Sequence, residues 1–199
     1  MRRVSGIILA AGLSKRFNGN KLFFEINHKK LIEYVMENAN KSRLYEKIIV
    51  INDVNSFKKI IYNNFKLIIN NNYSSGMSTS IKSGIENVSS NSEGAMIILG
   101  DAPLVKEGII NKLIDEYSRH DKGMVGVYHN DDIRNPVIFS RGYFGDLKSI
   151  TGDRGAKSIV KKHMDDFFKV DIDDECLMDI DSVEDAIKFE NILRKNNKI

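Results

Sequence analysis

Short apolar runs of strand length recur along the chain and alternate with segments of helical spacing. The runs are "VSGIILA", "EKIIVIN", "FKLIIN", "GAMIILG" and "KGMVGVY", and each of the first four leads into a helical pattern. They are nearly continuous in Ile, Val and Leu, which is typical of strands that are covered on both faces. The pattern therefore predicts an α/β fold with a largely parallel sheet.

Two segments have a clear amphipathic helical pattern. In the segment 31–42, one helical face carries Leu31, Ile32, Val35, Met36 and Ala39. Near the C-terminus, "VEDAIKFENILRK" places Val183, Ile187, Ile192 and Leu193 on one face. Ser182 precedes this second segment and is predicted to be its N-cap.

The rhythm changes after residue 130. The stretch "DDIRNPVIFSRGYFGDL" predicts an irregular loop, a short strand that begins beside Pro136, and a short helix. We expect this piece to extend the sheet or to cover its edge. Further on, "LMDID" is predicted to end a strand with Asp179 and Asp181 on the same side.

Composition narrows the class of protein. With 199 residues, 42% hydrophobic and 29% charged, the chain fits one soluble domain over residues 1–199. The 30 Lys and Arg residues nearly balance the 27 Asp and Glu residues, so no strong field favours nucleic acid or an anionic membrane. Cys176 is the single cysteine, which excludes an internal disulfide and fits a reducing cytoplasm.

The loop after the first apolar run has the composition of a phosphate-binding loop. In open parallel sheets, ligands bind beyond the carboxyl ends of the strands. Ala10, Ala11 and Gly12 would allow a ligand to approach the backbone, while Arg16 and Lys21 offer cations for phosphate oxygens. Neither of the common glycine-rich phosphate motifs fits, so a basic surface loop without a ligand remains the alternative.

Three other stretches carry candidate chemistry. Asp101 in "GDAPLV" follows a buried strand and could bind Mg²⁺, or it could cap the next helix. "GMSTS" opens a helix whose free donors would favour an anion. "TGDRGA" is either part of a binding site or a turn with an N-cap aspartate.

Four of these elements, in this order, resemble the MobA-like nucleotidyltransferases, especially the molybdenum cofactor cytidylyltransferases. They are L-A-A-G-x-S-x-R-x-x-x-x-K from Leu9 to Lys21, the segment from Asn70 to Ser80, G-D-x-P at Asp101, and "GDRGA". The resemblance runs from residue 4 to about 190. It implies a three-layer, Rossmann-like α/β nucleotidyltransferase fold with a mostly parallel mixed sheet.

The chain also departs from the family pattern. Asn18 stands at the glycine after the arginine, Ala102 at a common glutamine, and Ser182 and Val183 at the Thr-Pro of "DIDTPED". Arg134 and Asn135 replace the Gly and His that usually precede the proline, so acceptor recognition is expected to differ.

The resemblance implies roles for particular residues. It assigns nucleotide binding to Leu9, Ala10, Ala11, Gly12, Ser14, Arg16, Lys21, Gly76, Ser80 and Asp101, with Arg16, Lys21 and Asp101 as the catalytic set. It assigns the acceptor to Met77, Ser78, Asn135, Asp153 and Gly155. Metal binding falls to Asp101 and Asp181, with Asp179 in reserve and Mg²⁺ as the cofactor.

The implied reaction transfers CMP from CTP, or a nucleotide from another NTP, to the terminal phosphate of molybdopterin, and it releases pyrophosphate. A molybdoenzyme would be a further partner. The alternatives are a guanylyltransferase of the same cofactor, a transferase for a sugar or alcohol phosphate, and a carrier that delivers the cofactor without catalysis. Ala11, at the first glycine of the L-A-G-G found in guanylyltransferases, favours CTP.

Overall fold

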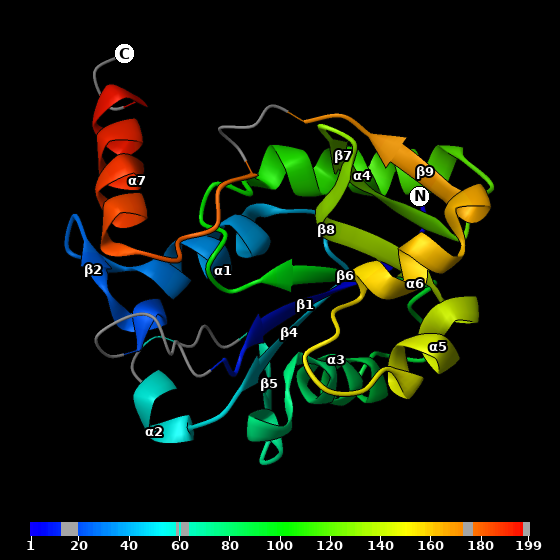
Figure 1. The fold of residues 1–199 in the computed structure, drawn as a ribbon, viewed down its shortest axis with the longest axis horizontal. Helices are drawn as coiled ribbons and strands as arrows, with labels where there is room; N and C mark the ends of the chain where they lie inside the picture. The colour runs from blue at the N-terminus through cyan, green and yellow to red at the C-terminus, as the bar shows by residue number, and fades with distance from the viewer. Residues whose placement is uncertain (13–19, 59, 61–63, 173–176, 197–199) are drawn as a thin grey trace.

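A mixed seven-stranded sheet forms the centre of the computed structural model, which describes residues 1–12, 20–58, 60, 64–172 and 177–196 (Figure 1). The strands lie in the order β5-β4-β1-β6-β8-β7-β9. They are β1 (Val4–Ala10), β4 (Glu46–Ile51), β5 (Lys66–Ile69), β6 (Gly94–Leu99), β7 (Met124–His129), β8 (Asp132–Ser140) and β9 (Phe167–Val170). Only β8 runs antiparallel to its neighbours β6 and β7, so the predicted mostly parallel mixed sheet is confirmed.

Helices cover both faces of this sheet (Figure 1). One face is packed against α1 (Leu31–Lys41), α2 (Val54–Phe57) and α4 (Glu107–Arg119). The other face is packed against α3 (Met77–Glu86), α5 (Phe144–Ser149) and α6 (Lys157–Lys162). The three-layer α/β architecture is therefore confirmed.

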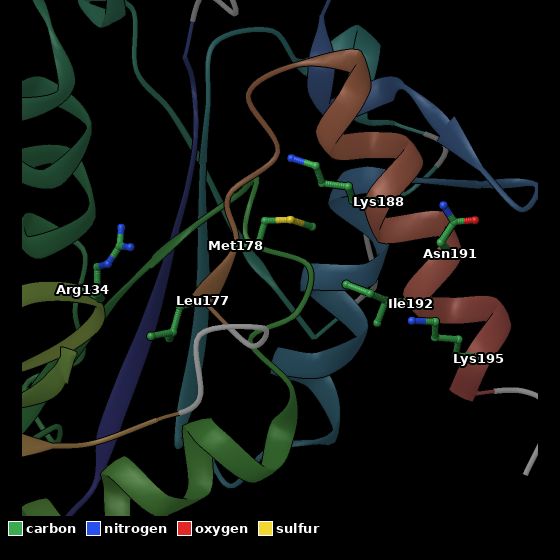
Figure 2. A pocket seen from close by; sticks show the side chains of 7 residues that line it. All are labelled: Arg134, Leu177, Met178, Lys188, Asn191, Ile192 and Lys195. Carbon is green, nitrogen blue, oxygen red and sulfur yellow. The ribbon is translucent and has the colours of Figure 1, made fainter. Parts of the chain in front are cut away.

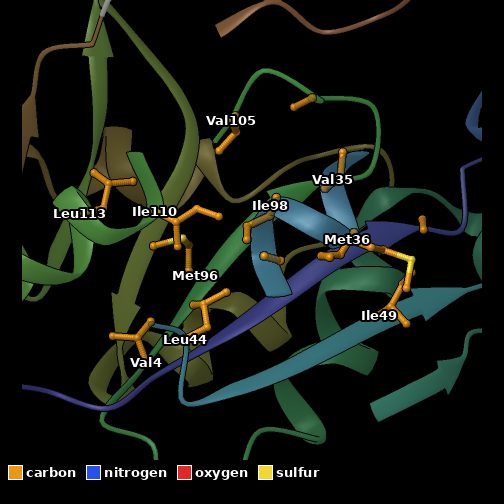
Figure 3. Close-up of a cluster of buried hydrophobic side chains, with 14 of the residues drawn as sticks. Val4, Val35, Met36, Leu44, Ile49, Met96, Ile98, Val105, Ile110 and Leu113 are labelled. Carbon is orange, nitrogen blue, oxygen red and sulfur yellow. The ribbon is translucent and has the colours of Figure 1, made fainter. Parts of the chain in front are cut away.

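Neighbouring residues of the central strands bury their side chains on opposite faces. Ile7 of β1 belongs to the cluster beneath α3, whereas Ile8 belongs to the cluster beneath α1 and α4. Figure 3 shows the second cluster, in which Val35 and Met36 of α1 and Leu113 of α4 lie against the sheet. Burial on both faces explains why the apolar runs of these strands are continuous rather than alternating.

The five predicted strands are confirmed, but the region after residue 130 differs from the prediction. Instead of an irregular loop and a short strand, β8 spans nine residues and continues through Pro136. Its register against β7 shifts between Gly126 and Val127, which interrupts the ladder near the proline. The short strand β9 was not anticipated from the sequence.

The C-terminal helix α7 (Val183–Asn196) packs at one end of the molecule beside the hairpin of β2 (Glu25–Ile26) and β3 (Lys29–Lys30) (Figure 1). Ser182 caps it as predicted, because its Oγ accepts from the N–H of Asp185 at 3.2 Å. The predicted apolar face is partly wrong, since Val183 and Ile187 are 49% and 55% exposed. Ala186 and Phe189 are the buried residues, because only that side of α7 meets α1 and the hairpin.

None of the described helices combines the length and the apolar character that crossing a bilayer requires.

Candidate active site

Asp101 lies at the carboxyl end of β6, where the chain passes close to the end of β1. The N–H of Gly100 donates to the carbonyl oxygen of Leu9 at 3.0 Å, and a Cβ at Gly100 would lie 2.8 Å from that oxygen. Only glycine fits this close approach, which sets the chain direction into Asp101. The helix-cap alternative for Asp101 is wrong, because the N-cap residue of α4 is Lys106.

Lys21 begins the 3-10 helix η1 (Lys21–Phe23), which Asn20 caps and the buried Leu22 anchors to the core. Its Nζ lies 2.5 Å from Asp101 Oδ2 and 2.8 Å from Asp181 Oδ1. Side chains from positions 21, 101 and 181 therefore meet at one point. The Lys21 and Asp101 side chains are mostly buried, whereas that of Asp181 is largely exposed.

Asp181 reaches this point through a segment without regular secondary structure rather than the strand that was predicted to end there. A backbone hydrogen bond of 2.9 Å, from the Ile180 N–H to the Asp101 carbonyl, joins the two aspartate segments. Ile180 is completely buried in the cluster beneath α7. This single bond and one buried side chain hold Asp181 beside Asp101.

The electrostatics of the site favour a cation. Burial, and then repulsion by Asp101 and Asp181, raise the pKa of Asp179 to about 6. Burial opposes the charge of Lys21, but attraction to Asp101 and Asp181 outweighs that effect and raises the pKa of Lys21. Two carboxylates contact the Lys21 ammonium and the Asp179 carboxyl lies within electrostatic reach of all three, so the negative charge of the site can exceed its positive charge.

The aspartate pair could hold a divalent cation. Oxygens of Asp101 and Asp181 already converge on one cationic atom, the Lys21 Nζ, which stands where a shared metal ion would have to lie. No group of three or more His, Cys, Asp or Glu side chains forms a metal cluster within the part of the chain that the structure describes. Mg²⁺ commonly uses only one or two carboxylates together with substrate phosphates, so this incomplete protein ligand set fits such an ion.

The predicted phosphate loop is described only in part. Leu9 is half-buried, Ala10 and Ala11 are buried at the end of β1, and Gly12 is exposed. A Cβ at Gly12 would touch nothing within 4 Å, so internal packing does not require a glycine there. Ser14 and Arg16 lie outside the described residues.

The two predicted acceptor segments lie side by side. Gly76 has a φ of 109°, and a Cβ there would lie 2.3 Å from the carbonyl carbon of Gly152. The N–H of Ser78 donates to the Gly152 oxygen at 3.1 Å, and a Cβ on Gly155 would lie 3.3 Å from the Met77 sulfur. "GMS" and "GDRGA" therefore form one surface, on which Asp153 is exposed.

The same contact corrects the expectation of free donors at the start of α3. The Ser78 N–H is used by Gly152, and the Oγ of Ser80 accepts a buried hydrogen bond of 2.9 Å from Asn70. Ser78 and Ser80 are 3% and 6% exposed. Met77, by contrast, is 42% exposed and is open to a ligand.

Sequence reasoning placed Asn135 in the acceptor-binding set and named Arg134 only as a departure from the family pattern that should alter acceptor recognition. Asn135 is half-buried on β8. Arg134 lies within electrostatic reach of Asp179, where its charge lowers the carboxyl pKa against the larger effects of burial and like charge. The signal in the sequence was its departure from the expected family pattern before Pro136.

A comparison with protein-family models matches residues 6–167 to the MobA-like NTP transferase domain. The chain belongs to this family. The matched region includes most of β1, Lys21, Asp101 and both segments of the acceptor surface, while Asp181 and α7 lie beyond it. The family resemblance inferred from the four sequence elements is thus confirmed.

Several curated relatives of this MobA-like chain are named as probable molybdenum cofactor guanylyltransferases. The chain is 25% identical over 115 residues to a probable molybdenum cofactor guanylyltransferase of Thermococcus sibiricus, covering 56% of this chain and 55% of that protein. It is 24% identical over 192 residues to a protein of the same name from Pyrococcus horikoshii, covering 96% and 94%. The match thus spans only a little over half the length of the first of these relatives.

The MobA-like fold is also clear among solved structures. The manganese complex of Rv0371c from Mycobacterium tuberculosis superposes with a TM-score of 0.80 at 18% identity, covering 96% of this chain and 98% of that one. At this identity the likeness establishes the fold alone.

Proposed function

We propose that this chain transfers a nucleoside monophosphate from a nucleoside triphosphate to the terminal phosphate of a molybdopterin-type acceptor. The observation that carries the proposal is the convergence of Asp101 and Asp181 on one cationic atom at the carboxyl edge of the sheet. Ligands of open parallel sheets bind at this edge. Family membership and the names of the curated relatives support the same activity.

The reaction needs positioning and charge neutralisation rather than a protein nucleophile. An oxygen of the acceptor phosphate attacks the α-phosphorus, the bond from that phosphorus to its bridging oxygen breaks, and pyrophosphate leaves. Lys21 donates to phosphate oxygens as a point charge, and Arg16 is proposed to do the same. Ala11 and Gly12 let the triphosphate approach backbone N–H groups after β1.

A divalent cation is part of the proposal, with Asp101 and Asp181 as its protein ligands and Asp179 in reserve. When bound, such an ion neutralises charge that develops on the phosphates. Mg²⁺ is our first choice because it is bound through few carboxylates and substrate oxygens. The manganese complex of the Mycobacterium tuberculosis structure supports the general use of a divalent ion on this fold.

Two observations point to different nucleotides. The curated relatives named as guanylyltransferases favour GTP. Ala11, in the L-A-A-G of the first loop, favours CTP. We propose GTP as the first substrate to test and CTP as its competitor.

The acceptor is proposed to bind at the surface shared by the start of α3 and the loop before α6. Exposed Met77 and Asp153 offer an apolar and a polar contact there, and Gly155 permits close approach. Ser78 and Asn135 complete the proposed set. A molybdoenzyme is the proposed recipient of the product, and no role in binding nucleic acid or membrane is expected.

The test measures pyrophosphate release from GTP, CTP or ATP, with molybdopterin present or absent and with Mg²⁺, Mn²⁺ or chelator. Turnover that requires both acceptor and metal supports the proposal. Binding of cofactor without pyrophosphate release with any nucleotide would instead indicate a carrier. Asp101→Asn is expected to reduce turnover by about 100-fold or more, while Asp115→Asn, an aspartate on α4 that pairs with Arg43 away from the site, should leave it unchanged.

A further inference from the structure

A cavity of about 570 Å³ lies between α7, the segment that leads into it, and the start of β8 (Figure 2). Its lining consists of Arg134, Leu177, Met178, Lys188, Asn191, Ile192 and Lys195. This volume is within the range of cavities that hold small organic ligands. None of the residues predicted from the sequence to bind nucleotide, acceptor or metal belongs to this lining.

The lining has the chemistry of a site for an organic anion. Arg134, Lys188 and Lys195 bring three positive charges, and no carboxylate is among the lining residues. Leu177, Met178 and Ile192 supply the apolar surface between them, as Figure 2 shows. An anion with an apolar or aromatic body would satisfy both parts.

Arg134 is the strongest element of the site. Its Nε is buried and has no hydrogen-bond partner, and no ion pair within 4 Å involves it in the described parts of the chain. The nearest residue of opposite charge on its own strand, Asp132, is paired with Lys157 at 3.1 Å. A buried donor without a partner costs free energy, which a bound anion would recover.

The cavity adjoins the candidate active site. Met178 lines the cavity, and Asp181, three residues further along the chain, contacts Lys21 in the active site at 2.8 Å. Arg134 lies on β8 directly before Asn135, a residue of the proposed acceptor set. A ligand in the cavity would therefore extend toward the aspartate pair.

We propose that this cavity binds the phosphate end of the acceptor of nucleotidyl transfer, an organic phosphate whose anionic group pairs with Arg134 and whose adjoining apolar part lies on Met178 and Ile192, while the surface at Met77 and Asp153 contacts the rest of the molecule. The identity of the ligand as the acceptor rests on the proposed function. The existence of an anion-binding site in the cavity does not. Arg134 thereby contributes to acceptor specificity.

The binding test uses phenyl phosphate, with phenol and inorganic phosphate as probes for each half of the ligand. Phenyl phosphate is expected to bind more tightly than either and to shift the methyl NMR signals of Met178 and Ile192. Arg134→Gln should weaken its binding by about 10- to 100-fold, and Arg134→Lys by less. Arg119→Gln on the surface of α4 should change nothing.

Lys195→Glu provides a second variant at an exposed position that does not endanger folding. It should weaken phenyl phosphate binding several-fold because it reverses a charge at the rim. If the wild type, Arg134→Gln and Lys195→Glu bound phenyl phosphate equally, the proposed anion site would be refuted. Phenol binding as tightly as phenyl phosphate would refute it as well.

Kinetics separates the acceptor assignment from the proposed function. Phenyl phosphate should inhibit transfer in competition with the acceptor and without effect on the KM for the nucleotide. Inhibition that competes with the nucleotide would overturn the acceptor assignment. A protein with no transferase activity that still binds phenyl phosphate through Arg134 would refute the proposed function and retain the site.

Discussion

Replacing Lys21 by methionine removes the cation between Asp101 and Asp181 while keeping most of the side-chain volume. Lys21 donates to both aspartates, at 2.5 and 2.8 Å. An exposed ion pair is worth up to about 1 kcal/mol, whereas loss of one partner of a fully buried pair costs about 3 to 5 kcal/mol. The Lys21 and Asp101 side chains are 15% and 19% exposed, so we expect Lys21→Met to cost about 2 kcal/mol of unfolding free energy without metal.

The same substitution should strengthen metal binding while it weakens catalysis. Without the ammonium, the two carboxylates are free to bind a divalent ion, so the Kd for Mg²⁺ or Mn²⁺ in the absence of nucleotide should fall. Turnover should drop by about 100- to 1000-fold, because a positioned positive charge no longer contacts the phosphates. If metal affinity rises while turnover falls, the Lys21 ammonium occupies the position of the metal ion. A lysine that only stabilised the fold would not raise metal affinity.

Calorimetry gives the metal affinity, urea unfolding with and without Mg²⁺ gives the stability, and pyrophosphate release gives the turnover. Lys66→Met is the matched control, because the Lys66 Nζ donates to a backbone carbonyl at an exposed position away from the site. Normal turnover in Lys21→Met would refute the proposed role of Lys21. Metal affinity that falls, or that matches the Lys66→Met value, would refute the shared position.

Three further predictions concern stability and are measured by urea unfolding. Gly76→Ala should cost about 1 to 3 kcal/mol or more, because the φ of Gly76 is 109° and its added Cβ meets backbone, whereas Gly12→Ala, in open space, should cost less than about 0.5 kcal/mol. Phe189→Ala should cost about 3 to 5 kcal/mol, because that ring is 1% exposed and holds α7. Burial and the hydrogen bond to Asp166 raise the pKa of Tyr143 to about 12. Its contribution is complete below the unfolded pKa of about 10 and is lost as pH rises toward 12, so Tyr143→Phe should flatten the decline in stability over that interval.

The central strands could be predicted because a strand that is buried on both faces has a continuous run of apolar residues. The run "VSGIILA" coincides with β1, and "GAMIILG" contains all of β6. β8 was predicted too short because Pro136 and the polar residues before it resemble a loop. Its pairing with β7, which tolerates a register shift, is a tertiary feature that local patterns do not report.

Amphipathic spacing also overstated what α7 buries. Four apolar positions were expected on one face, but Val183 and Ile187 are exposed because the helix meets its neighbours along a single narrow contact. The residues that do the packing, Ala186 and Phe189, lie on an adjacent side. Spacing identifies a helix, and only the position of its neighbours decides which of its apolar residues are buried.

The candidate site, like the fold, was predicted from the sequence only in part. Local patterns marked Lys21, Asp101 and Asp181 as chemically suggestive, yet nothing in their spacing brings together three positions each about eighty residues apart. Their convergence depends on the close contact of Gly100 with β1 and on the bond from Ile180 to Asp101. The sequence marked Arg134 as a departure from the family pattern, but it could not show that the Arg134 Nε is buried without a hydrogen-bond partner beside the cavity. The sequence therefore identified the residues that form ion pairs with one another. The buried nitrogen without a hydrogen-bond partner, which leaves Arg134 open to a ligand, could be found only from the structure.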